Sequence, residues 1–307
     1  MDKHLVFLSG AAIDHFYEIE TFLKEGDSCM CKPLGSRIGG CVLNAATVSS
    51  KLGSNVKVID YLRSNDEGTA MLLEGLKEKG VDTSYIRFGE NVINGTCLIM
   101  KKGDEKCIYV IEPERPFFEE DDSLKDILFN ASYIYSLMHM VKKAFRNTDL
   151  LHEARSHGAR IVFDGSSQYR EGYEKDMVLD LADGFFMNRE AYERFKEVCG
   201  SDPIVKMLDR GAEFCCVTDG SRGASCYCKE GVYSLPAYKI AVVDSTGAGD
   251  SFAGAFLHFR NKGCDFRECL EYASACGAYA CTKEGGMAGA IEEKELLDFN
   301  NRIKKEG

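Results

Sequence analysis

Several features that would place a chain in a special class are scarce among these 307 residues. There are only 5 prolines, and apolar side chains make up 45% and charged ones 28%, which is the composition of a globular protein rather than a disordered or fibrous one. The longest apolar stretches, such as residues 253–259, fall well short of the ~20 residues that cross a bilayer. The first residues lack the layout of a secretory signal. We therefore expect a cytoplasmic protein with no membrane partner.

Positive charge is also in deficit. The 38 basic side chains against 49 acidic ones leave a net charge of -11, which repels phosphate backbones and argues against nucleic acid as a general partner. Two nucleotide-binding motifs are missing as well. There is no Gly-x4-Gly-Lys-Ser/Thr, and the first apolar strand leads into residues 9–14 rather than into Gly-x-Gly-x-x-Gly. This sets aside the P-loop kinases and disfavours a dinucleotide-binding fold.

The chain has 14 cysteines but no Cys-x-x-Cys. The pairs with i, i+2 spacing are Cys29/Cys31 and Cys226/Cys228. On a strand this spacing puts both sulfurs on one face, but a zinc site needs further ligands at matched spacing. We expect the thiols to serve mostly as small buried apolar groups.

Hydrophobic periodicity alternates between strands and helices. A buried first strand at residues 5–8 is followed by helical patterns at 42–52 and 66–79, with strands at 55–62 and 84–88 around them. Further strands are predicted at residues 132–137, 160–164, 184–187, 214–218, 224–228 and 238–243. This order predicts a mainly parallel sheet covered by helices on both faces.

One segment departs from that rhythm. Two apolar runs flank residues 101–106 as in a β-hairpin, with Gly103 in the turn. We interpret the chain as a single domain, residues 1–307, with a small β-flap built from strands within about 14–35 and 92–115.

The most informative stretch is residues 243–252, where an apolar run gives way to a glycine-rich turn and a helix. Such a turn directs backbone N–H groups and the positive helix end at one point, which makes an anion site. Gly247 and Gly249 allow close approach of a phosphate, and Asp250 stands in the first helical turn. A carboxylate there suits a base that takes the proton of an attacking hydroxyl during phosphoryl transfer. The alternative is an ordinary helix cap.

Residues 244–250, Asp-Ser-Thr-Gly-Ala-Gly-Asp, closely resemble the C-terminal signature of the ribokinase-like, or pfkB, carbohydrate kinases. Residues 38–46 and 51–53 resemble the N-terminal signature. The resemblance implies a ribokinase-like three-layer αβα sandwich with a mainly parallel central sheet and a small β-sheet lid. It makes Asp250 the general base and directs the amides of Gly247, Ala248 and Gly249 at the migrating phosphoryl group.

The same resemblance assigns the sugar to Asp14, Gly39, Gly40 and Asn44. Their chemistry agrees, because carboxylate and amide groups bind hydroxyls and paired glycines let a ligand lie against the backbone. The alternatives are a solvated loop charge for Asp14 and a polar helix residue for Asn44. Both residues are expected at the carboxyl edge of the sheet, where open α/β sheets place ligands.

For the nucleotide, the resemblance implies contacts from Thr218, Gly220, Gly223, Asn188 and Thr246. A plain hairpin turn is the alternative for the loop at residues 218–223.

Two metal assignments also follow from the resemblance. The family's Asn-x-x-Glu, which organises Mg²⁺ through water, is Asn188-Arg189-Glu190-Ala191 here, so Glu190 comes one residue early. On a helix one residue is a rotation of about 100°. Asp244 matches an aspartate of the family's monovalent cation site, which makes K⁺ a further candidate.

One motif departs from the family in a way that concerns the sugar. Asp164 begins the sequence Asp-Gly-Ser where many relatives have Asp-Pro-Asn followed by an arginine, and Arg170 is the candidate to replace that arginine. This departure leaves the identity of the sugar open.

The sequence thus predicts an ATP-dependent kinase that phosphorylates a primary hydroxyl of a monosaccharide, with Mg²⁺. A nucleoside kinase of the same family and a non-catalytic sugar-binding or regulatory relative are the alternatives. Apolar flap residues Leu98, Ile108 and Val110 favour a homodimer.

Overall fold

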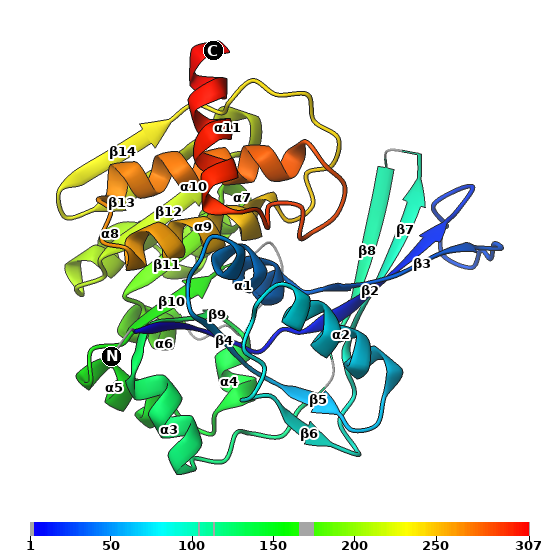
Figure 1. Ribbon diagram of the computed structural model, residues 1–307, viewed down its shortest axis with the longest axis horizontal. Coiled ribbons are helices and arrows are strands. Elements are labelled where there is room, and N and C mark those ends of the chain that lie inside the picture. Colours follow the sequence, from blue (N-terminus) through cyan, green and yellow to red (C-terminus); the bar gives the residue numbers. More distant parts are fainter. Residues whose placement is uncertain (1–2, 104, 113, 166–174, 307) are drawn as a thin grey trace.

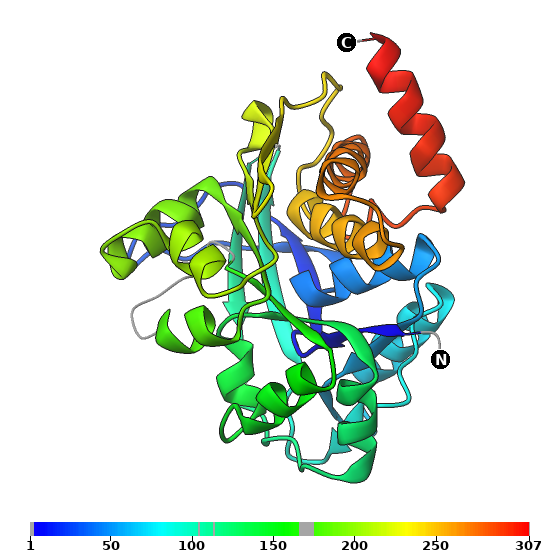
Figure 2. The same ribbon diagram turned by 90° about the vertical axis from the view of Figure 1, so that its left-hand side faces the viewer.

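The computed structural model describes residues 3–103, 105–112, 114–165 and 175–306. A large sheet of eight strands runs through the body in the order β14-β13-β12-β11-β10-β9-β1-β4 (Figures 1 and 2). The pairings from β4 to β12 are parallel, and β13 and β14 are antiparallel additions at one edge. The eight strands are β1 His4–Leu8, β4 Val56–Ile59, β9 Ala131–Leu137, β10 Arg160–Asp164, β11 Gly184–Asn188, β12 Phe214–Thr218, β13 Ala224–Cys228 and β14 Gly231–Leu235.

Helices cover both faces of this sheet, and the alternation of side chains in β1 shows the two layers. Leu5 and Phe7 pack into one apolar core, Val6 and Leu8 into the other. The first core is closed by α1 Cys41–Lys51, α2 Glu67–Glu78, α9 Ala248–Asn261, α10 Phe266–Cys281 and α11 Glu293–Glu306. The second is closed by α3 Asp122–Phe129, α4 Met140–Ala144, α5 Asp149–Ser156, α6 Lys175–Leu181, α7 Arg189–Cys199 and α8 Pro203–Asp209. The predicted αβα sandwich is confirmed.

A second sheet of four strands, in the order β3-β2-β7-β8, projects from the body (Figure 1). We call it the small sheet; its strands are β2 Ala12–Glu18, β3 Lys32–Gly39, β7 Gly95–Lys102 and β8 Glu105–Ile111. A further pair, β5 Tyr61–Arg63 and β6 Arg87–Gly89, lies beside it.

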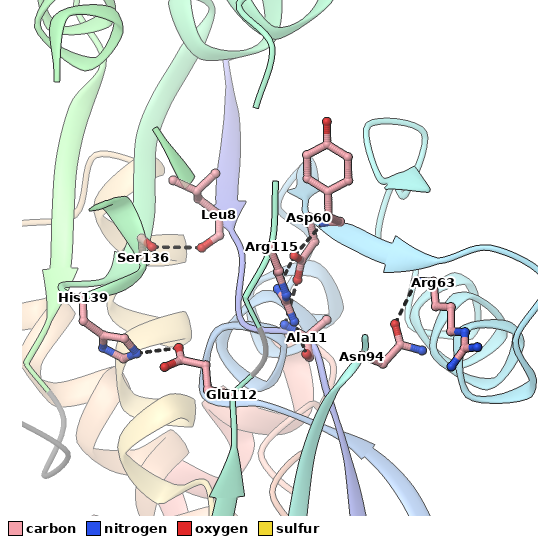
Figure 3. A network of polar contacts seen from close by, with 10 residues as sticks. Leu8, Ala11, Asp60, Arg63, Asn94, Glu112, Arg115, Ser136 and His139 are labelled. Carbon is pink, nitrogen blue, oxygen red and sulfur yellow. Dashed lines mark hydrogen bonds and ion pairs between the residues drawn. The ribbon is translucent and has the colours of Figure 1, made fainter. Parts of the chain in front are cut away.

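Polar contacts fix the base of the small sheet to the body (Figure 3). The guanidinium of Arg115 pairs with the buried carboxylate of Asp60 and donates to the carbonyl of Ala11 at 3.0 Å. Beyond β8, Glu112 lies 2.9 Å from the ring of His139. Since the buried charges of Arg115 and Asp60 are costly to leave unpaired, the strands of the small sheet join the body at a defined point.

Helices α1 and α9 pack closely because small residues meet between them. A Cβ added to Gly254 would lie 2.4 Å from the carbonyl oxygen of Ala45, and Ser49 donates to the carbonyl of Gly254 at 2.8 Å. This close approach brings the first turns of the two helices, which carry Asn44 and Asp250, together.

One local prediction was wrong. Residues 238–243 form no strand: Val242 and Val243 are exposed, and the N–H of Val243 donates to the carbonyl of Cys281 at 2.8 Å. Their β-branched side chains have no sheet neighbour to pack against, and β propensity depends on such packing. Asp14 lies inside β2, paired with Arg37 and Cys97 in the small sheet, so the alternative of a solvated loop charge does not hold. In the described ranges no helix is long and apolar enough to span a bilayer.

Candidate active site

A cavity of about 390 Å³ lies between the small sheet and the carboxyl edge of the large sheet. The predicted residues that line it are Asp14, Gly40, Asn44, Asn188, Thr218, Thr246, Gly247, Gly249 and Asp250. Nine predicted residues from five separate segments therefore meet at one place. A larger hollow of about 800 Å³, beside α4 and α6, holds none of the predicted residues.

The glycine turn before α9 has the form that an anion site needs. Gly247 has a φ of 74°, and a Cβ there would lie 2.0 Å from the carbonyl oxygen of Gly286, so only glycine fits. A Cβ at Gly249 would meet nothing within 4 Å, because this residue faces the cavity. The N–H of Ala248 donates to the carbonyl of Ser245 at 3.3 Å, so this amide already has a partner.

Asp250 is held in the cavity wall by Asn44, whose Nδ2 donates to its carboxylate at 2.7 Å. Burial raises the pKa of Asp250 to about 7; the negative charges of Asp164 and Asp14 act in the same direction, and hydrogen bonds from Asn44 and Cys41 oppose them. The side chain stays partly accessible from the cavity. A carboxyl group with a pKa near neutrality is suited to accept and return a proton.

The amide of Asn44 has a second role available. Its Oδ1 is buried, and among the described residues nothing donates to it. A buried acceptor without a donor costs about 1–3 kcal/mol, so a ligand hydroxyl that donates to it would be bound favourably. Asn44 itself lines the cavity.

Close contacts within the protein require glycine at both positions of the pair 39 and 40. A Cβ at Gly39 would lie 2.2 Å from Oδ2 of Asp14, so Gly39 makes room for that carboxylate. Gly40 has a φ of 98°, and a Cβ there would lie 2.0 Å from the carbonyl oxygen of Gly10. The position that a Cβ would take at each glycine is therefore occupied by the protein's own Asp14 or Gly10, while Gly40 still lines the cavity.

Three titratable residues of the cavity wall were not assigned a role from the sequence: Cys41, Cys97 and Asp164. Burial raises the pKa of Asp14, and a hydrogen bond from the thiol of Cys97 lowers it. Asp164 ends β10 and accepts a hydrogen bond from Tyr135 Oη at 2.8 Å. Cys41 follows the glycine pair directly, which is the one sequence signal that could have pointed to it.

With this geometry in view, the chain can be compared with known proteins. Residues 3–294 match the model of the pfkB family carbohydrate kinases. The chain belongs to this family. Membership confirms the resemblance seen in the sequence and the predicted enzyme class, a carbohydrate kinase.

Individual relatives of this pfkB-family kinase are distant. A probable fructokinase-5 from Arabidopsis thaliana is 26% identical over 277 residues, covering 81% of this chain and 83% of its own. A nucleoside kinase from Methanothermobacter thermautotrophicus is 24% identical over 299 residues, covering 96% and 95%. The structure of Arabidopsis thaliana ribokinase complexed with ribose and ATP superposes with a TM-score of 0.84 at 22% identity, covering 98% and 99%, which confirms the ribokinase-like fold.

At the end of the site predicted to bind the nucleotide, the carboxylate of Asp219 connects two segments of the kinase. Asp219 accepts hydrogen bonds from Arg222 at 2.7 Å and from Arg189 at 3.3 Å, which ties the turn after β12 to the start of α7. Gly223 has a φ of 104°, and a Cβ there would lie 2.0 Å from the carbonyl oxygen of Leu235. Gly223 and Gly220 shape this turn but do not line the cavity, whereas Thr218 does.

Asn188 caps α7 by accepting from the N–H of Ala191 at 2.7 Å and lines the cavity. Glu190 does not reach the cavity: its carboxylate is paired with Arg194 along the exposed side of α7. The one-residue displacement in the motif explains this, because it rotates the side chain away from the sheet edge. Asp164 and Thr218 supply oxygen atoms to the cavity wall, and among the described residues no group of three or more His, Cys, Asp or Glu side chains could hold a metal ion.

Asp244 lies next to the glycine turn. Its Oδ1 accepts from the N–H of Thr246 at 3.0 Å, from its Oγ1 at 2.6 Å and from Nζ of Lys106 at 3.1 Å, and its Oδ2 accepts from the N–H of Gly285 at 3.2 Å. Burial acts to raise the pKa of Asp244, and these hydrogen bonds outweigh it and hold the pKa far below its ordinary value. Four donors leave this carboxylate little capacity as a ligand, so the residues present do not fit the predicted monovalent ion.

Proposed function

We propose that this kinase transfers the γ-phosphoryl group of ATP to a primary hydroxyl group of a monosaccharide. The observation that carries the proposal is the joint position of Asp250, Asn44 and the glycine turn in one cavity. The ribokinase that was solved with ribose and ATP supports both substrates.

Asp250 accepts the proton of the sugar hydroxyl as its oxygen forms a bond to the γ-phosphorus. The bond from that phosphorus to the bridging oxygen breaks, and ADP leaves. The N–H groups of Gly247 and Gly249, with the positive end of α9, face the phosphoryl group as its charge shifts. Bound Mg²⁺ would neutralise phosphate charge, held through water by the oxygens of Asp164 and Thr218.

The acceptor end supplies oxygen atoms for hydroxyls. Asn44 Oδ1 is a buried acceptor, and the carboxylate of Asp14 lies across the cavity on β2. The small sheet carries Asp14, Cys97, Ile108 and Val110 on the cavity wall, so it acts as a lid whose closure over a sugar excludes water.

The substrate class is tested by measuring ADP release with a panel of pentoses, ketoses and nucleosides. The Asp250→Asn variant gives the ADP release that does not depend on the proposed base. We expect turnover with at least one monosaccharide and little with nucleosides. Turnover confined to nucleosides would favour the alternative that this protein is a nucleoside kinase. The similarity to the Methanothermobacter thermautotrophicus nucleoside kinase, 24% identical, supports that alternative. Titration calorimetry with the same panel separates a protein that binds a sugar without turnover from one that does not bind it.

We also propose a homodimer across the small sheet. β8 is an edge strand on which Ile108, Tyr109, Val110 and Ile111 are all exposed. Apolar side chains along an open edge favour covering by a second copy. Light scattering after gel filtration should give twice the mass of one chain, and a monomer at micromolar concentration would refute the dimer.

A further inference from the structure

The tip of the small sheet touches the glycine turn through one side chain. Lys106, near the start of β8, places its Nζ 3.1 Å from Oδ1 of Asp244 and in contact with Oγ1 of Thr246. These groups belong to segments far apart in the sequence, and both charged side chains are largely covered, at 31% and 26% exposed.

The register of the small sheet explains why Lys106 points this way. Side chains alternate along a strand, so Lys106 shares a face with Ile108 and Val110, which line the cavity. The cross-strand partners of Ile108 and Val110 are Ile99 and Cys97, and these line the cavity too. Lys106 thus continues a row of cavity-facing residues toward the turn. Lys102, on the other face of β7, pairs with Glu105 and is exposed.

Asp244 joins the two segments that shape the turn. It accepts from Thr246, which precedes Gly247, and from Gly285 in the loop after α10. Gly286, next to Gly285, is the residue against which Gly247 packs. Because the carboxylate of Asp244 is largely covered, it needs a positively charged partner. Among the described residues, its ion pair is with Lys106. The hydroxyl of Thr246 donates to Asp244, so its lone pairs are free to accept from the ammonium.

We propose that Lys106 supplies, from the small sheet, the cation that Asp244 requires, so that this kinase organises its anion turn with a lid ammonium and needs no monovalent metal ion. The proposal rests on the proposed function. It makes Lys106 a positioning residue that acts through Asp244 and Thr246. It also couples closure of the small sheet over a sugar to the order of the turn that faces ATP.

The test compares the wild type, Lys106→Met and the matched control Lys102→Met, each in KCl and in tetramethylammonium chloride of equal ionic strength. The wild type and Lys102→Met should turn over equally in both salts. Without K⁺, the kcat/KM for ATP of Lys106→Met should be about tenfold lower than that of the wild type, because one charge-assisted hydrogen bond is lost. KCl or methylammonium chloride should restore part of this kcat/KM. A conservative variant, Lys106→Arg, should retain most of the activity.

Thermal unfolding gives a readout that does not depend on turnover. KCl should raise the unfolding midpoint of Lys106→Met above its value in tetramethylammonium chloride, and leave the wild type unchanged, because only the variant has a place for the ion. A wild type that needs K⁺, or a Lys106→Met variant equal to the wild type in K⁺-free buffer, would overturn the proposal. If no sugar is turned over by any protein, the proposed function fails, and the unfolding comparison still decides the role of Lys106.

Discussion

Two aspartates on either side of one glycine turn have opposite electrostatic surroundings. Asp250 faces two other carboxylates and receives hydrogen bonds from Asn44 and Cys41, and burial raises its pKa to about 7. Asp244 is also partly buried but receives four hydrogen bonds, one of them from an ammonium, and its pKa lies far below the ordinary value. The residue type is the same, so the number and charge of the donors decide which acid can exchange a proton and which is a fixed anion.

The largest expected effect is on the proton acceptor. Asp250→Asn should lower kcat by roughly 10²–10⁴ because the amide cannot take the hydroxyl proton, while sugar and ATP still bind. Rapid-quench kinetics and calorimetry measure the two parts. Asp298→Asn, an exposed aspartate on α11, is the matched control and should behave as the wild type. Near-full turnover of Asp250→Asn would contradict the assignment.

The acceptor end can be perturbed without touching either aspartate of the turn. Gly39→Ala puts a methyl group 2.2 Å from Oδ2 of Asp14, so that carboxylate must move. The KM for the sugar should rise by about 10–100-fold, with the KM for ATP little changed, since one or two hydrogen bonds to a charged group are lost. Leu34→Ala, exposed on the same strand, controls for changes in β3. An equal rise in both KM values would place Asp14 outside the sugar site.

Asp244→Asn should have a smaller effect, and on the nucleotide side. The amide keeps part of the hydrogen bonding to Thr246 and Gly285 but loses the charge that pairs with Lys106. We expect kcat/KM for ATP to fall by about tenfold and sugar affinity in calorimetry to stay the same. Loss of sugar affinity alone would contradict the separation of the two ends.

The pH profile gives the smallest and most specific effect. Asp250 must be ionised to accept a proton, so kcat/KM should rise with pH through about 7 and then level. The thiol of Cys41 stabilises the ionised form, so Cys41→Ala should move this rise to higher pH. A rise near pH 4 would show that Asp250 has an ordinary carboxyl pKa.

The same shift has a consequence for stability. An acid whose pKa is higher folded than unfolded destabilises the folded state as pH rises between the two values. Asp250→Asn should therefore unfold at a higher temperature than the wild type at pH 8, and this difference should shrink toward pH 4.

The parts of the site that depend on local sequence were predictable. The glycine turn, Asp250 and the α1 glycine pair lie in short segments whose residues dictate a turn followed by a helix. Contacts that depend on the pairing of distant strands were not predictable. Asp14 meets Cys97 only because β2 and β7 pair in parallel, and Lys106 reaches Asp244 only because β8 follows the register of β7.

In the fold, too, local features were predictable from the sequence and the extent of the sheet was not. Buried strands such as β12 are apolar runs that packing reinforces, so the sandwich followed from periodicity. Residues 238–243 have a similar composition but lie beyond the sheet edge, and composition alone does not reveal where a sheet ends.

The most direct test is a crystal structure with a sugar that the kinase turns over and a nonhydrolysable ATP analogue. The account predicts a carboxylate oxygen of Asp250 at about 2.6–3.2 Å from one sugar hydroxyl, with that hydroxyl facing the γ-phosphorus above the Gly247 turn. A sugar whose reacting hydroxyl lies against another residue, with Asp250 bonded only to Asn44, would contradict it.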